Sequence, residues 1–160
     1  MARRDKENYY LDIAETVLER STCGRRMYGA IIVLNDEIVA TGYNGAPRGR
    51  KNCDEMGGCI RDKMNIPSGE RYELCRSVHA EANAIISAAR RDMIGATLYL
   101  VGRNAKTGEL LADTMSCSMC KRLIINAGIT RVLNRVGKDE YVTVPVRDWI
   151  FDDDTLPTTL

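Results

Sequence analysis

The sequence predicts an α/β fold, a three-layer α/β/α arrangement in which helices cover both faces of a central mixed sheet of about five strands. Apolar residues recur every three or four positions in several segments, which indicates amphipathic helices. Short runs rich in β-branched residues lie between and after these segments, which indicates strands. Because helices and strands alternate along the chain, we expect helices to cover the sheet and ligands to bind where strand ends meet helix starts.

The strands are expected to begin with a hairpin that follows an N-terminal helix. Residues 7–20 carry apolar side chains at helical spacing and predict the helix. Residues 30–34 and 38–41 predict two strands, and the polar pair Asn35-Asp36 between them predicts a tight turn. Three later runs predict further strands at residues 97–101, 130–133 and 141–146.

Two more helices are expected ahead of the strands in the second half of the chain. Ser77 is expected to cap a helix that extends to about Ala89, and Gly128 is expected to end a helix that follows Cys117. His79 therefore falls in the first turn of one helix, and Cys117 falls at the start of the other.

The composition is that of one globular domain, expected to span residues 1–160 and to include a cysteine-rich insertion at about residues 48–76. Of the 160 residues, 44% are hydrophobic, enough to build a core. The net charge of +1 provides no broad positive electrostatic field to attract a nucleic-acid backbone, so nucleic acid is not an expected partner.

No apolar run is long enough to cross a bilayer, and the polar start lacks a signal segment. We therefore expect no membrane contact, a cytoplasmic location and reduced cysteines. The acidic residues 152–154 and those after them are expected to form a solvated tail.

The clearest chemical signal comes from His79, Glu81, Cys117 and Cys120. Two thiolates separated by two residues at a helix start can face one tetrahedral zinc ion, and an imidazole from another element supplies a third ligand. The fourth position stays open for a water, whose pKa a zinc ion lowers to about 7. Glu81 would point near this open position without filling it, and could carry protons during deamination of an amidine-like C–NH₂ carbon.

Three other interpretations of these residues stay open. A single histidine on an apolar helix face is often a core residue. A CxxC pair is also compatible with a thioredoxin-like redox site or with a purely structural zinc. The redox interpretation leaves His79 and Glu81 without a task, and Ser116 stands where such sites carry an aromatic residue. The two motifs together therefore favour a catalytic zinc.

Four stretches of the sequence match motifs of one known family. They are Ser21-Thr22-Cys23-Gly24-Arg25-Arg26 leading to Gly29-Ala30, Thr41-Gly42-Tyr43-Asn44-Gly45-Ala46-Pro47-Arg48-Gly49, His79-Ala80-Glu81-Ala82-Asn83-Ala84-Ile85, and Cys117-Ser118-Met119-Cys120. With these motifs the chain resembles the zinc-dependent cytidine/deoxycytidylate deaminase superfamily, and most closely its dCMP deaminase branch. The resemblance implies a cytidine-deaminase-like fold and zinc-dependent hydrolytic deamination of dCMP to dUMP, a reaction that supplies thymidylate synthesis.

The resemblance also implies roles for individual residues. His79, Cys117 and Cys120 would hold the catalytic zinc, and Glu81 would shuttle protons. Asn44 matches the asparagine that hydrogen-bonds the substrate nucleoside, although its neighbours alone favour a simple turn. Three arginines in or near the motifs are suited to the substrate phosphate, or are solvated surface residues: Arg25, Arg26 and Arg48.

The other four cysteines are candidate ligands for a second, structural zinc: Cys23, Cys53, Cys59 and Cys75. Some dCMP deaminases carry such a zinc, and Cys23 and Cys53 match cysteines in the corresponding family motifs. Four thiolates suit a closed tetrahedral site, which would order an insertion that has little apolar periodicity. The alternative is four reduced cysteines, some of them buried as small apolar residues.

Two departures from the family pattern leave the substrate open. Ser116 replaces the usual proline before the first cysteine of the pair, and residues 102–115 form a longer connection than in many relatives. A zinc deaminase acting on a nucleoside, a base or a tRNA adenosine, and a noncatalytic zinc-binding module, therefore stay as alternatives. The resemblance further implies a homo-oligomer, a hexamer or a dimer, and makes dCTP and dTTP candidate effectors.

Overall fold

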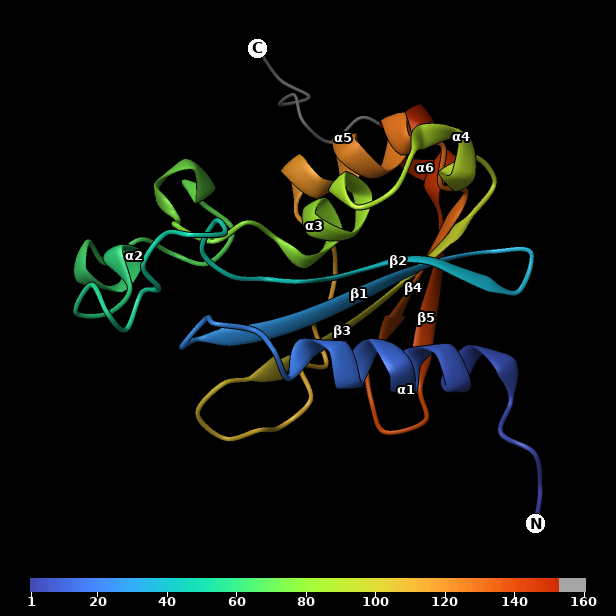
Figure 1. Ribbon diagram of the computed structural model, residues 1–160, viewed down its shortest axis with the longest axis horizontal. Helices are drawn as coiled ribbons and strands as arrows, with labels where there is room; N and C mark the ends of the chain where they lie inside the picture. Colours follow the sequence, from blue (N-terminus) through green and yellow to red (C-terminus); the bar gives the residue numbers. More distant parts are fainter. Residues whose placement is uncertain (153–160) are drawn as a thin grey trace.

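The computed structural model describes residues 1–152, and its centre is a mixed sheet of five strands (Figure 1). The strands are β1 Arg26–Leu34, β2 Glu37–Tyr43, β3 Thr97–Asn104, β4 Arg131–Arg135 and β5 Tyr141–Pro145. They lie in the order β2-β1-β3-β4-β5, and only β3 and β4 are a parallel pair. The prediction of a mixed sheet of about five strands is confirmed. The predicted tail beyond Asp152 lies outside the described residues.

Helices cover both faces of this sheet, as predicted. On one face lies α1 (Lys6–Leu18), drawn below the sheet in Figure 1. The helices of the opposite face are α3 Ala80–Ile86, α4 Arg90–Met93, α5 Ser118–Ala127 and α6 Val146–Phe151. Two short turns of helix lie to one side, in the predicted insertion: α2 Ile60–Lys63 and η1 Tyr72–Leu74. Within residues 1–152, no helix combines the length and the apolar character needed to span a membrane.

Alternating side chains of the strands build a core on each side of the sheet. In β1, Ile31 and Val33 pack in the cluster under α1, whereas Ile32 packs in the cluster under the helices of the opposite face. The same alternation occurs in β3, where Tyr99 faces α1 and Leu98 faces the other side. Successive residues of a strand point to opposite faces, so both strands hold both helix layers in place.

Two strand glycines allow helices to approach the sheet closely. A Cβ atom on Gly29 would lie 2.1 Å from the backbone oxygen of Ala14 in α1. On Gly42 it would lie 2.3 Å from backbone atoms of both Ala80 and Ala84 in α3. Because these distances are far below van der Waals contact, α1 and α3 can pack here only where the strand has no side chain.

The start of α3 differs from the prediction. Its N-cap residue is His79 rather than Ser77, so the helix begins at Ala80. The segment before it is extended because Val78 and Gly45 exchange two backbone hydrogen bonds, of 2.7 and 3.2 Å. His79 therefore lies at the end of an extended segment and not within a helical turn.

The hairpin is confirmed, but β3 is longer than predicted. Asn35 and Asp36 form the turn with φ angles of 52° and 63°, the left-handed conformation that matches the twist of a two-residue hairpin. In β3, pairing with β1 continues as far as Asn104, which faces Arg26. The predicted connection over residues 102–115 therefore begins inside the sheet.

Candidate active site

The two metal motifs meet at the N-terminal ends of α3 and α5. His79 is the N-cap residue of α3, Cys117 is the N-cap residue of α5, and Cys120 lies in the first turn of α5. The Nδ1 atom of His79 lies 3.4 Å from the Sγ atom of each cysteine, and the three donor atoms all lie within 4.8 Å of one another. In the described part of the chain, no other group of three or more histidine, cysteine or acidic side chains has all its donor atoms within this distance of one another.

The donor set fits a zinc ion. Tetrahedral zinc, with Zn–S bonds of about 2.3 Å and Zn–N bonds of about 2.0 Å, places neighbouring donors roughly 3.6 Å apart. Hydrogen bonds to Cys120 and His79 lower the pKa of Cys117 to about 4. The contact with Cys117 raises the pKa of His79 and, together with burial, that of Cys120. One thiolate is therefore favoured by the protein itself, and a bound cation would stabilise the second.

Glu81 lies beside these ligands in the first turn of α3 and is only 5% exposed. Burial raises the pKa of its carboxyl above the ordinary value for glutamate. A carboxyl whose neutral form is stabilised can hold a proton and release it later, which general acid/base catalysis requires.

Asn44 is fixed by three hydrogen bonds just after β2. Its Oδ1 accepts from Ser21 Oγ at 2.6 Å and from the backbone N–H of Tyr28 at 2.8 Å. Its Nδ2 donates to the backbone oxygen of Arg26 at 2.9 Å. The side chain is buried and lines the same cavity as Glu81. One Nδ2 hydrogen stays free of these bonds and is available to a ligand.

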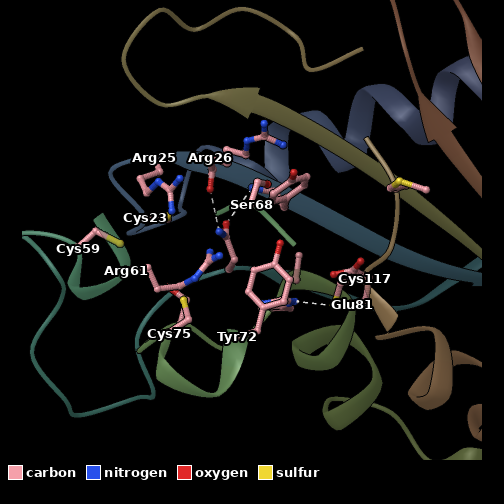
Figure 2. Close-up of a pocket in the computed structure, with 16 residues that line it drawn as sticks. Cys23, Arg25, Arg26, Cys59, Arg61, Ser68, Tyr72, Cys75, Glu81 and Cys117 are labelled. Atoms are coloured by element: carbon pink, nitrogen blue, oxygen red, sulfur yellow. Dashed lines mark hydrogen bonds between the residues drawn. The ribbon is translucent and has the colours of Figure 1, made fainter. Parts of the chain in front are cut away.

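The cavity has a volume of about 110 Å³ and is lined by three arginines (Figure 2): Arg25, Arg26 and Arg61. Arg25 Nε lies 3.0 Å from a carboxylate oxygen of Asp62, and Arg26 Nη1 lies 3.3 Å from one of Asp113. Arg48 is exposed and is not among the residues that line this cavity. The phosphate roles of Arg25, Arg26 and Arg48 stay predictions.

The cavity is also lined by Arg61 and Tyr72 of the insertion, which belong to none of the motifs found in the sequence. The ring of Tyr72 meets the ring of His79 edge-on, with centroids 5.1 Å apart. The Cζ atom of Arg61 lies 4.5 Å from the centroid of the same tyrosine ring. The course of the insertion brings them here, and neither spacing nor periodicity marks them in the sequence.

The four other cysteines lie near one another beside the cavity. Cys23, Cys59 and Cys75 line its wall (Figure 2). Burial raises the pKa of the Cys53 thiol, and the nearby thiolates of the other three raise it further. All four are free thiols, and they are gathered less tightly than the ligands around His79.

The zinc-binding motifs belong to a known family of enzymes. Residues 4–135 match the family described as the cytidine and deoxycytidylate deaminase zinc-binding region. The chain belongs to this deaminase family. The match runs from before α1 to the end of β4 and includes both metal motifs, so the resemblance found in the sequence is confirmed.

Individual members of the family match at different lengths. The chain is 38% identical over 137 residues to the deoxycytidylate deaminase of Mycobacterium phage D29, a match that covers 83% of this chain and 96% of the phage protein. It is 36% identical over 127 residues to the deoxycytidylate deaminase of Schizosaccharomyces pombe, covering 79% of this chain. The chain spans only 36% of that yeast relative.

A solved structure extends the similarity to three dimensions. The dCMP deaminase of cyanophage S-TIM5 in complex with dCMP and dUMP aligns with a TM-score of 0.58 at 26% identity, covering 84% of each chain. The prediction of a cytidine-deaminase-like α/β fold is therefore confirmed.

Proposed function

We propose that this chain catalyses the hydrolytic deamination of dCMP to dUMP with release of ammonia. The observation that carries the proposal is the cluster of His79, Cys117 and Cys120 beside the buried carboxyl of Glu81, in a cavity also lined by Asn44. Three zinc ligands and one carboxylate that is not a ligand form the arrangement that a zinc deaminase uses. The similarity to the D29 and S-TIM5 proteins favours a deoxycytidylate substrate.

The reaction divides among these residues. His79, Cys117 and Cys120 would hold a zinc ion, which when bound activates water for attack on C4 of the base. Asn44 would orient the nucleoside through its free Nδ2 hydrogen. Glu81 takes a proton from the attacking water and gives it to N3 of the ring, then carries the second proton to the departing amine. The water oxygen bonds to C4, the bond from C4 to the exocyclic amino nitrogen breaks, and ammonia leaves.

Ammonia release from dCMP and from deoxycytidine, measured on protein of known zinc content, tests this proposal. We expect efficient turnover of dCMP and weak turnover of deoxycytidine. Equal or better turnover of deoxycytidine would identify a nucleoside deaminase instead. If zinc-loaded protein turned over neither compound, other bases would be tried, and failure of all of them would leave a noncatalytic zinc-binding module.

A second, structural zinc is proposed at the four remaining cysteines, Cys23, Cys53, Cys59 and Cys75. Support comes from their proximity beside the cavity and from the donor chemistry of four thiols. Thiolate ligands need a reducing compartment, which favours the cytoplasm. A zinc content near two per chain is expected, and a content of one would contradict the second site.

A homo-oligomer is the proposed assembly. Large apolar side chains are exposed on α3 and α5, and a second copy would cover them: Ile86, Met119 and Leu123. Light scattering after size-exclusion chromatography should give the mass of a dimer or a hexamer, and a monomer would contradict the proposal. Regulation by dCTP and dTTP stays a prediction, which turnover of dCMP with and without each nucleotide would test.

A further inference from the structure

Among the described residues, the guanidinium of Arg61 has no anionic partner, although it is almost fully buried. Arg61 is 5% exposed. Its Nη2 donates to the backbone oxygens of Pro67 at 2.7 Å and Glu70 at 2.8 Å, and these bonds close a loop of the insertion. Its Nε is buried without a hydrogen-bond partner in residues 1–152. A buried charge in this state is unfavourable unless an anion completes its surroundings.

The other two arginines of the cavity differ from Arg61 in this respect. Asp62 neutralises Arg25 and Asp113 neutralises Arg26. Both side chains are also about one-third exposed, at 32% and 40%, so water solvates what the carboxylates do not. Of the three cavity arginines, Arg61 is therefore the one whose charge is not neutralised by a carboxylate of the described residues.

Arg61 lies near the metal ligands at a separation that suits the far end of a nucleotide whose base is bound there: its Cζ atom is 4.5 Å from the centroid of the Tyr72 ring, which is 5.1 Å from that of the His79 ring. The ring of Tyr72 thus contacts both His79 and Arg61, and Figure 2 shows Tyr72 and Arg61 side by side in the cavity. Its guanidinium plane is held by the two carbonyls of the loop and by the face of this ring, so it is oriented before any ligand binds. Ser68, from the same loop, lines the cavity and offers a hydroxyl donor.

We propose that Arg61 binds the 5′-phosphate of the substrate and makes this chain select a nucleotide over a nucleoside. The proposal rests on the proposed deamination of dCMP and assigns its phosphate subsite to the insertion rather than to the motif arginines. Arg61 is thus a specificity-determining residue, since a phosphate removes the unpaired charge and a nucleoside leaves it buried and unpaired.

Kinetics of zinc-loaded Arg61→Gln with dCMP and with deoxycytidine test the proposal. We expect kcat/KM for dCMP to fall about 100-fold, mainly through KM, because the contact is made equally in the ground and transition states. The kcat/KM for deoxycytidine should stay within about threefold of wild type, since this substrate has no phosphate. Arg71→Gln is the matched control: it removes an exposed arginine of the same insertion, paired with Glu73, and should change neither value.

An equal loss on both substrates would overturn the proposal, because Arg61 would then act only by closing its loop. Unchanged kinetics with dCMP would overturn it as well. If Arg61→Gln does not fold, Arg61→Lys is measured instead, with an expected fall of about tenfold in the preference for dCMP over deoxycytidine. An unchanged preference would contradict the assignment.

If wild-type protein turned over no dCMP, the proposed function would fail. Calorimetry with dUMP and deoxyuridine would then still test Arg61, through a selective loss of dUMP affinity in the variant.

Discussion

In the proposed reaction the carboxyl of Glu81 gains and loses a proton in every turnover, so replacing one of its oxygen atoms with an amide nitrogen is expected to abolish activity. Glu81→Gln keeps the size of the side chain but cannot accept a proton, and kcat should fall about 10³-fold or more. Zinc content should stay at the wild-type level because Glu81 is not a ligand. Ammonia release and zinc content measure the two effects. Glu19→Gln, which changes an exposed glutamate at the end of α1, is the control. An active variant, or one that loses zinc, would exclude the assigned role.

The sequence predicts the residues of the site whose chemistry is carried by short spacings, and fails where the fold alone brings residues together. Two residues separate Cys117 from Cys120, and one separates His79 from Glu81, so local geometry is enough to indicate a shared metal site. Arg61 is different, because its contact with the cavity depends on the path of the whole insertion. The same reason explains the wrong cap of α3: local propensity favours a serine, and a long-range bridge overrides it.

At the level of elements, the contact between β2 and α3 sets the position of the metal motif. Gly42→Ala would place a methyl group 2.3 Å from the backbone of α3, which must then move outward. We expect a loss of about 1–3 kcal/mol in unfolding free energy and weaker zinc binding, measured by chemical denaturation and zinc titration. Gly24→Ala is the control because a Cβ atom there meets nothing within 4 Å. If Gly42→Ala had the stability and zinc affinity of the wild type, the close packing of α3 on β2 would not set the position of the metal motif.

A second contact between elements joins α1 to β4 through charges. Arg135 is buried, with only 1% of its side chain exposed, and its Nη2 lies 2.9 Å from an oxygen of Asp12. Partial burial acts to raise the pKa of Asp12, but hydrogen bonds from Arg4 and Arg135 outweigh it, and the net shift is downward. The carboxylate therefore stabilises the fold above its unfolded pKa of about 4, and this contribution is lost as the pH falls through the lower folded value.

Asp12→Asn should therefore cost about 1 kcal/mol of unfolding free energy at pH 7, with little difference from wild type at the acid end. Denaturant unfolding of both proteins, from pH 7 down to a pH below the lowered pKa of Asp12, measures the dependence. Asp92→Asn, an exposed aspartate in α4, should show no such change. A destabilisation of Asp12→Asn that is constant across this range would mean that lost packing, not lost charge, is responsible.

Periodicity predicts α1 and α5 well because each of these helices exposes one face and buries the other within a single segment. The hairpin is predicted by the polar turn at Asn35-Asp36 between two apolar runs. Periodicity fails at the end of β3, where residues 102–104 are held in the sheet by pairing with β1 and not by their own pattern. The length of the strand thus depends on a partner strand whose paired residues lie 74–78 positions earlier in the chain, and no local window contains them.

For the whole molecule, the question is what holds the insertion, because the apolar core does not. Within the described residues, neither core cluster includes a side chain between positions 41 and 79. The contacts that order this segment are polar, such as the loop closed by Arg61. Three free thiols lie in the segment, those of Cys53, Cys59 and Cys75, and a fourth, that of Cys23, lies before it in the chain. A metal ion that joined those thiols would supply the constraint that buried apolar area supplies elsewhere.

Cys59→Ser tests whether the proposed second zinc couples the insertion to the site. We expect zinc to fall from two to one per chain, Tm to fall by roughly 5 °C, and trypsin to cleave faster at Lys51 and Lys63. Since the insertion carries Arg61, KM for dCMP should rise while turnover of deoxycytidine changes little. Met64→Ser, which changes an exposed residue of the same insertion, is the control for a lost side chain. Unchanged zinc content and proteolysis in Cys59→Ser would mean that polar contacts alone order this segment, and that substrate selection does not depend on a metal.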